Sequence, residues 1–505
     1  MEHTALANSW KYLVCLIAGG VLTLAFAPYN YAGVAIISTA LLFYCWDHAS
    51  ARTALLCGYL YGLGLFGTGV NWLHISINMF GGMNLAGALF LTYLLVAFLA
   101  LYPAAAGYLS RKLHTHNTLT LPVIIPALWT LTEWCRSWIF TGFPWLNLGY
   151  SQIDTKLAAI APLLGVYGVS WVVCVSATLL VILYQASGAR KFIAVAVLAC
   201  IWITATLLNR MDWTAPVGDE IRVALVQPAI KQRLKWEPEQ QQRIVETQMA
   251  LSDPYWGYQL IIWPETAVPM FYHQAIPLIE KMQSLADKYQ TEFITGIPYM
   301  DPASKNYYNS IMVIGDKPDI YHKRHLVPFG EYLPFSRWLR PLLDFIQIPM
   351  SDFSAGTYAK PLIHAADIPI GVSICYEDVF GAEVIEALPE AQLLLNVSND
   401  AWFGDSLAPH QHLQMARMRA RETGRYMLRA TNNGISAIID EKGKIISQLP
   451  QFEPRALAGT IRLFTGTTPY AKYGNVLIVS LCLLALVIAA MLAKADLLKI
   501  NKPPA

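Results

Sequence analysis

Charged side chains are scarce in this sequence, and they are unevenly placed. Asp, Glu, Lys and Arg make up 14% of its 505 residues, against about 25% in an ordinary soluble protein. Residues 1–209 hold only twelve of them, and most of the other fifty-eight lie between 210 and 470. This distribution excludes a chain exposed to water throughout and indicates lipid around the first part. A net charge of +2 also excludes the strongly basic surface of a nucleic-acid-binding protein.

Cysteine is nearly absent from the polar part of the chain. Seven of the eight cysteines lie in apolar runs, and only Cys375 lies outside them. A lone thiol excludes an internal disulfide framework in that part. Such a cysteine is either a reactive group or a small buried hydrophobe. The residue types around it indicate which of the two applies.

Long apolar runs are abundant, and a helix that spans a bilayer needs about 20 mostly apolar residues. The runs that we interpret as spans lie near 11–28, 31–46, 53–75, 84–109, 119–142, 157–185, 192–209 and 474–493. The first lacks a small-residue cleavage site, so we expect it to be retained and not removed as a signal peptide. The sequence therefore predicts an integral membrane bundle of eight transmembrane helices. Seven lie in a domain over residues 1–209, and the last is a C-terminal helix at 474–493.

Basic residues beside the spans predict how the bundle is oriented. If the spans alternate, one side carries Lys11, Arg52, Arg111, Lys112, Arg190, Lys191, Lys494, Lys499 and Lys502. The short loops on the other side, at 29–30, 76–83 and 143–156, carry only Lys156. By the positive-inside rule both termini are cytoplasmic, and the segment between the last two spans lies on the outer side.

That outer segment, residues 215–468, has the pattern of an extramembrane α/β domain. The expected strands are Arg222–Val226, Leu260–Trp263, Glu292–Ile297, Ser310–Ile314, Asp319–His322, Ile370–Cys375, Leu393–Val397, Tyr426–Ala430 and Ile435–Ile439. The expected helices are Pro238–Leu251, Ile276–Tyr289 and His412–Arg425. This alternation predicts a layered sheet covered by helices. Residues 210–220 and 464–473 are interpreted as linkers to the membrane part.

Residues 338–353 carry many large apolar side chains between two strand regions. One interpretation is a helix packed on the core. The other is a lid or arm that touches lipid, because exposed apolar patches usually mark a partner or a membrane.

Three predicted strands end in residues that suit nucleophilic catalysis. Cys375 ends one of them, at the edge of the sheet where α/β proteins place ligands. Acids follow it directly and would raise its pKa, so a reactive thiol here needs a base and a cation. Glu265 follows another strand and could act as a general base. Lys323 follows a third and could stabilise an oxyanion, with Glu331 eight residues later to orient Lys323 or the substrate.

These motifs resemble a known family. Trp263-Pro-Glu265, then Lys323 with Pro-Phe-Gly-Glu331, then Cys375-Tyr-Glu-Asp resemble the Glu-Lys-Cys triad of the nitrilase, or carbon–nitrogen hydrolase, superfamily. With the eight spans, nearly the whole chain is similar to its apolipoprotein N-acyltransferase branch. Further matching segments are 142–152, 396–404 and 226–236. The resemblance implies a nitrilase-like αββα sandwich for the outer domain.

The resemblance also implies an activity, placed in the periplasm and inner membrane of a bacterium. Glu265 would take the proton of Cys375, which would attack a phospholipid ester, typically of phosphatidylethanolamine, while Lys323 stabilises the oxyanion. The thioester would pass its acyl chain to the α-amine of an S-diacylglyceryl-cysteine apolipoprotein, the last step of lipoprotein maturation. Residues with implied support roles are Glu331, Tyr376, Glu377 and Trp236. Trp402, Phe403 and Trp145 are substrate-binding candidates from matching segments.

Two other clusters have alternative interpretations. Glu133 and Arg136 lie three apart in a predicted span, where charges are costly, so they either pair or place Arg136 against a phospholipid headgroup. His410 and His412 have no third ligand candidate, so we expect them to stabilise a loop and expect no metal site. We expect no cofactor.

Two rival functions remain open on this evidence. A membrane-anchored amidase would use the same triad on a small C–N substrate, with water as acceptor. A transporter would use the outer domain to bind solute, but broken or repeated spans are not evident. Acyl transfer is favoured because a thioester beside water hydrolyses, and an apolar arm over a membrane-tethered site would exclude water.

Overall fold

The computed structural model describes residues 2–47, 49–113, 120–333, 353–357 and 359–500. The chain divides into two compact units. The first comprises Met1–His74, Leu89–Met211 and Tyr473–Ala505, and the second comprises Ile75–Ala88 and Asp212–Lys472. Apart from Phe353, the apolar arm expected at 338–353 lies outside the described residues.

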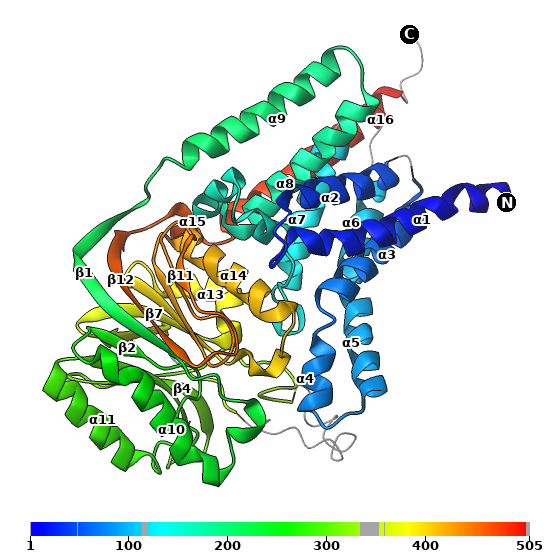
Figure 1. Cartoon of the computed structure of the whole chain (residues 1–505). Coiled ribbons are helices and arrows are strands. Elements are labelled where there is room, and N and C mark those ends of the chain that lie inside the picture. Colours follow the sequence, from blue (N-terminus) through cyan, green and yellow to red (C-terminus); the bar gives the residue numbers. More distant parts are fainter. Residues whose placement is uncertain (1, 48, 114–119, 334–352, 358, 501–505) are drawn as a thin grey trace. The chain divides into compact units, whose positions relative to one another are not determined.

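Helices occupy the apolar runs before residue 209 and after residue 473 (Figure 1). They are α1 (Glu2–Leu22), α2 (Ala32–Trp46), α3 (Ala51–Gly69), α4 (Leu73–Met79), α5 (Leu85–Leu99), α6 (Leu101–Lys112), α7 (Ile125–Arg136), α8 (Ala161–Gln185), α9 (Ala189–Leu208) and α16 (Val476–Ile500). Among the described residues, three stretches are long and apolar enough to cross a membrane: Leu85–Lys112, Lys156–Gln185 and Ala189–Leu208. The bent pair α3 and α4 makes a fourth if it counts as one span. The predicted helical character of this part is confirmed.

One helix ends earlier than the sequence predicts. The span expected at 119–142 forms a helix only as far as Arg136, at the end of α7. Beyond it, Phe140, Thr141 and Gly142 have φ values of 53°, 73° and 94°. This left-handed region is incompatible with a continuing α-helix, so the chain turns there.

The second unit contains two six-stranded sheets among its described residues. The first has the order β12-β1-β2-β3-β4-β5 and the second β11-β10-β9-β8-β7-β6. The strands of the first are β1 (Thr214–Gln227), β2 (Leu260–Ile262), β3 (Glu292–Met300), β4 (Tyr307–Ile314), β5 (Asp319–His322) and β12 (Arg455–Gly466). Those of the second are β6 (Leu362–Ala365), β7 (Ile368–Ile374), β8 (Leu393–Ser398), β9 (Met427–Thr431), β10 (Ala437–Ile439) and β11 (Ile445–Gln448).

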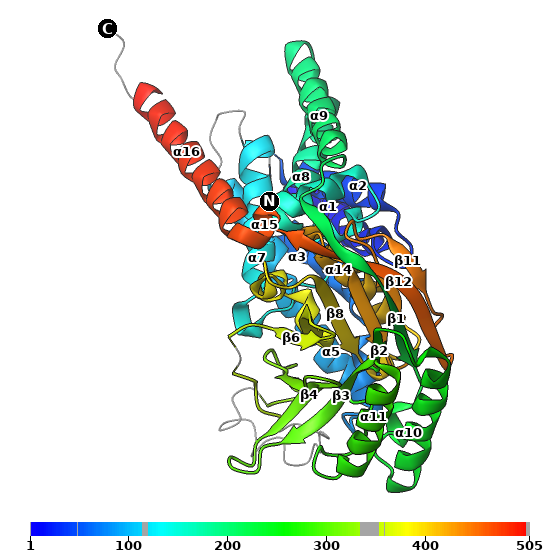
Figure 2. The same ribbon diagram turned by 90° about the vertical axis from the view of Figure 1, so that its left-hand side faces the viewer.

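The two sheets pack face to face between helices. One buried cluster joins Leu225 and Ile262 of the first sheet to Val372 and Leu395 of the second. The helices of this unit are α10 (Pro238–Ser252), α11 (Ile276–Tyr289), α13 (Gly381–Val384), α14 (Leu407–Thr423) and α15 (Pro469–Tyr473). Figures 1 and 2 show α10 and α11 together on the first sheet, and Figure 1 shows α14 on the second. The result is the expected four-layer αββα sandwich, whose apolar contacts supply the hydrophobic stabilisation.

Each of the two segments interpreted as linkers contains part of a strand, and the second also contains α15. Thr214 pairs with Gly466 and Val217 with Leu463, so β1 and β12 continue into the stretches 210–220 and 464–473. Their exposed, alternating side chains gave no continuous apolar signal. Helix α14 also begins five residues before the predicted start at His412, because Ser406 caps it by accepting a hydrogen bond from the Ala408 amide at 3.3 Å.

Strand direction explains why the expected catalytic residues meet. β2 is parallel to β3, which is antiparallel to β4, which is antiparallel to β5. The carboxyl ends of β2 and β5 therefore lie at the same edge of the first sheet, and Glu265 and Lys323 follow those two ends. Cys375 follows β7 in the facing sheet.

Candidate active site

Cys375 lies at a sharp turn between β7 and a 3₁₀ segment, Cys375–Val379. Its φ of 51° places it in the left-handed region, which a side chain other than glycine rarely adopts. The residue is only partly exposed. Its carbonyl accepts hydrogen bonds from Asn396 Nδ2 at 3.3 Å and from His412 Nε2 at 3.2 Å. The turn lifts the side chain off the strand end, as a nucleophile requires.

Glu265, Lys323 and Glu331 are joined into one cluster by Asn309 of β4. Asn309 Nδ2 donates to Glu265 Oε1 at 2.7 Å and to Glu331 Oε1 at 3.1 Å. Lys323 Nζ lies 2.8 Å from Glu331 Oε2, and its side chain is 1% exposed. Glu265 is also buried, and its Oε2 has no hydrogen-bond partner among the described residues. That oxygen is therefore available to a proton donor inside the site.

The three groups form one electrostatic site. Burial raises the pKa of the Cys375 thiol, Glu265 raises it further, and Lys323 opposes both. Burial likewise raises the pKa of Glu265 against the charge of Lys323. For Lys323, burial lowers the pKa, but Glu331, Cys375 and Glu265 outweigh it and leave the pKa raised. These shifts favour a protonated thiol at Cys375 and a charged Lys323, and they make Glu265 a stronger base than an exposed carboxylate.

Glu377 ties the turn at Cys375 to the loop that carries Lys323. Its Oε1 accepts from Tyr321 Oη at 2.9 Å, from the Arg324 amide at 2.7 Å and from the His325 amide at 3.1 Å. Its Oε2 accepts from the Ile374 amide at 2.7 Å. One buried side chain thus fixes the ends of β5 and β7, which belong to different sheets.

Family models match both parts of the chain. The apolipoprotein N-acyltransferase N-terminal domain matches residues 18–179, and carbon-nitrogen hydrolase matches residues 222–467. The apolipoprotein N-acyltransferase of Methylococcus capsulatus is 46% identical over 93% of this chain and 94% of its own length. The chain belongs to the apolipoprotein N-acyltransferase family. The resemblance drawn from the motifs is confirmed, and the chain is an enzyme of the carbon–nitrogen hydrolase superfamily.

The chain is also similar to other known proteins. The apolipoprotein N-acyltransferase of Nitrosomonas europaea is 40% identical over 96% of this chain and 98% of its own length. Among solved structures, a nitrilase-superfamily protein of Saccharomyces cerevisiae is 19% identical with a TM-score of 0.38, covering 49% of this chain and 91% of that one.

Lys235 is a residue of the site that the sequence reading missed. It is 3% exposed, and its Nζ donates to the Glu265 carbonyl at 3.1 Å. Burial lowers its pKa to about 8, against the opposing charge of Glu265. Its neighbour Trp236, expected from the family resemblance, has an indole Nε1 that is buried without a partner among the described residues. In the sequence, the position of Lys235 next to Trp236 was the feature that could have identified it as a site residue.

The aromatic substrate-binding candidates of the second unit lie in a short 3₁₀ turn, Asp400–Phe403. Trp402 and Phe403 are both partly exposed. The ring of Trp402 packs edge-on against Phe80, with centroids 4.9 Å apart. Tyr376, next to the nucleophile, contacts Phe380 at 5.0 Å. One aromatic residue thus directly follows Cys375 in the sequence, and two more lie at the end of the 3₁₀ turn.

Trp145 and Arg136 lie in the first unit, and both are buried. Arg136 donates to the Phe143 carbonyl at 2.9 Å, to the Trp145 carbonyl and to Asn147 Oδ1 at 2.5 Å. Glu133 accepts from the Leu148 amide at 2.9 Å. The two charges therefore hold the segment that follows α7, and a contact of Arg136 with a headgroup stays a prediction.

Proposed function

We propose that this enzyme transfers an acyl chain from a phospholipid to the α-amine of the S-diacylglyceryl cysteine of an apolipoprotein. The observation that carries the proposal is full-length similarity, up to 46% identity, to proteins named apolipoprotein N-acyltransferase. A buried Glu, a buried Lys and a partly exposed Cys at three strand ends support it, because this set of groups suits acyl transfer through a thioester.

In the first half-reaction, Glu265 takes the thiol proton and the sulfur attacks the carbonyl carbon of a phospholipid ester. The electron pair of the carbonyl moves to its oxygen, and Lys323 stabilises the resulting oxyanion. The intermediate then expels a lysophospholipid, whose oxygen takes the proton back from Glu265. The unpartnered oxygen of Glu265 and the burial of Lys323 support these two roles.

In the second half-reaction, the α-amine attacks the thioester carbonyl. Glu265 accepts a proton from the attacking nitrogen, the C–S bond breaks, and the thiolate of Cys375 takes that proton. The products are an amide and the original thiol, so no cofactor is required. Water must be kept away while the thioester waits for the amine, and we assign Trp402 and Phe403 to lipid contacts that exclude it, while Trp145 stays a predicted substrate contact.

The other motif residues have supporting roles in this proposal. Glu331 fixes Lys323 through the 2.8 Å ion pair. Glu377 fixes the turn at Cys375 through the hydrogen bonds described above. Tyr376 and Trp236 would contact the substrate from either side of the thiol.

We place the enzyme in a bacterial inner membrane, with eight spans, cytoplasmic termini and residues 215–468 in the periplasm. The apolar helices and the basic residues on one side support this topology. Phe80 adds support, since the predicted outer loop 76–83 packs on Trp402 as it would from the same side of the membrane. Phosphatidylethanolamine is the proposed donor.

A two-substrate assay tests the proposal. Purified protein in vesicles receives phosphatidylethanolamine labelled in one acyl chain and a peptide that begins with S-diacylglyceryl cysteine. We expect label in an amide of the peptide with the wild type and none with Cys375→Ala. Release of the label only as free fatty acid would contradict transfer, and turnover of small amides without lipid turnover would favour the amidase.

A further inference from the structure

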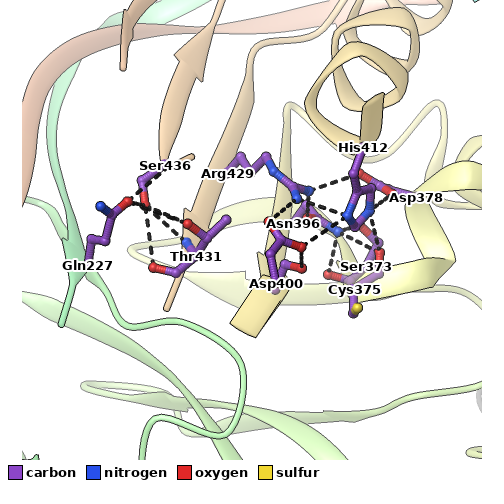
Figure 3. Close-up of polar contacts among 11 residues, drawn as sticks. Gln227, Ser373, Cys375, Asp378, Asn396, Asp400, His412, Arg429, Thr431 and Ser436 are labelled. Carbon is purple, nitrogen blue, oxygen red and sulfur yellow. Dashed lines mark hydrogen bonds and ion pairs between the residues drawn. The ribbon is translucent and has the colours of Figure 1, made fainter. Parts of the chain in front are cut away.

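A buried polar cluster lies behind the nucleophile, on the side away from its thiol (Figure 3). It comprises Asp378, Asp400, His412 and Arg429, which are at most 4% exposed. Arg429 Nη2 donates to Asp400 Oδ2 at 3.0 Å and to His412 Nδ1 at 2.9 Å, and Nη1 lies 3.5 Å from Asp378 Oδ2. Burying this many charges is costly, so a specific task for them is expected.

The cluster reaches Cys375 through its main-chain carbonyl. His412 Nε2 lies 3.2 Å from that oxygen and 2.7 Å from Asp378 Oδ1. Asn396, which accepts from Arg429 Nη1 at 2.5 Å, donates to the same carbonyl at 3.3 Å. Figure 3 shows the sulfur of Cys375 pointing away from these groups, so they act on the backbone of the nucleophile and not on the thiol.

The chemistry of the contacts assigns the proton on His412. Both groups near Nε2, a carbonyl and a carboxylate, are acceptors, so Nε2 carries a proton whatever the state of the other nitrogen. Arg429 and Asp400 hold the opposite edge of the ring. His412 is therefore a fixed donor, and it lies inside α14, which begins five residues before the predicted helix start at His412.

We propose that His412 is a positioning residue, which holds the Cys375 carbonyl so that the nucleophile keeps its left-handed backbone. A strained φ of 51° persists only where neighbours enforce it. Asn396 and His412 enforce it from β8 and α14, and Asp378 with Asp400 and Arg429 hold the ring. The inference rests on the proposed function, in which Cys375 is the nucleophile.

Two amide substitutions separate this role from a general structural one. His412→Gln puts an N–H near the place of Nε2, whereas His412→Asn puts one near the place of Nδ1. Ser436→Ala is the matched control, because Ser436 is fully buried and bonds Gln227 at 2.7 Å and Thr431 at 3.1 Å in a cluster without contact to Cys375 (Figure 3). Arg429 is avoided, since its loss would leave buried carboxylates unpaired.

The measurements are the rate of Cys375 alkylation by iodoacetamide per folded molecule, and kcat and KM for acyl transfer. We expect His412→Asn to lower kcat and the alkylation rate about 100-fold, the cost of a misplaced reacting group. His412→Gln should lower kcat and the alkylation rate by about tenfold or less. KM should stay near the wild-type value in both, and Ser436→Ala should lose stability but keep the alkylation rate.

Wild-type rates in both His412 variants, or an equal loss in Ser436→Ala, would overturn the inference. Where the His412 variants do not fold, Asp378→Asn tests the same contact, and an unchanged alkylation rate there counts against it. A wild type that alkylates but takes no acyl label would instead refute the proposed function, since alkylation does not depend on lipid.

Discussion

Replacing Lys323 with methionine removes the charge that the proposed mechanism places on the oxyanion. The ammonium is 1% exposed and 2.8 Å from Glu331. For charges about 4 Å apart at an effective dielectric constant near 20, Coulomb's law gives about 4 kcal/mol. At about 1.4 kcal/mol per tenfold, this corresponds to a loss of roughly 10²- to 10³-fold, which matches the removal of one oxyanion-hole donor.

The same substitution should change the thiol before any substrate binds. Lys323 lowers the pKa of Cys375 against burial and Glu265, so its loss raises that pKa further. The pH profile of alkylation by iodoacetamide should therefore move to more alkaline pH. The assay combines this profile with single-turnover acylation of Cys375 from labelled phospholipid.

Two controls accompany Lys323→Met. Lys323→Met with Glu331→Gln removes the carboxylate that would otherwise remain unpaired, and it should lose as much acylation as the single variant. Lys235→Met removes the other buried lysine near Glu265, which contacts its carbonyl. Acylation by Lys323→Met within tenfold of the wild type, with an unmoved alkylation profile, would refute the role of Lys323.

Other predictions follow from the same contacts. In the wild type, alkylation of Cys375 should rise through pH 9.0 without a plateau, because burial and Glu265 raise the pKa of the thiol above that ordinary value; a plateau at lower pH would contradict this. Lys235→Met should move the acidic limb of kcat/KM to higher pH, because burial raises the pKa of Glu265 and Lys235 lowers it. Glu377→Gln turns one buried acceptor oxygen into a donor against backbone amides, and it should lower the free energy of unfolding by about 1–3 kcal/mol, measured by denaturant titration.

The sequence predicted the parts of the site that follow strand ends. Glu265, Lys323 and Cys375 each end or closely follow a predicted strand, and strands that run in the same direction bring such ends to one edge of a sheet. Asn309, which joins Glu265 to Glu331, could not be found in this way. It lies inside β4, 44 residues from Glu265, and nothing local marks it.

The buried cluster behind Cys375 could not be predicted from the sequence either. Asp378, Asp400, His412 and Arg429 are far apart in the sequence, and only the fold brings them together and buries them. The strand β12 was not predicted because its buried residues Leu457, Ile461 and Leu463 are separated by small and polar residues and form no continuous apolar run. Periodicity identifies buried runs well and edge strands poorly.

The most direct test of the central claim is the mass of the peptide that contains Cys375 after incubation with phospholipid alone. The proposed mechanism predicts an acyl adduct on Cys375 that hydroxylamine removes, that forms slowly in Glu265→Gln and that is absent in Cys375→Ala. Acyl transfer to apolipoprotein by a wild type that never carries this adduct would contradict a thioester intermediate.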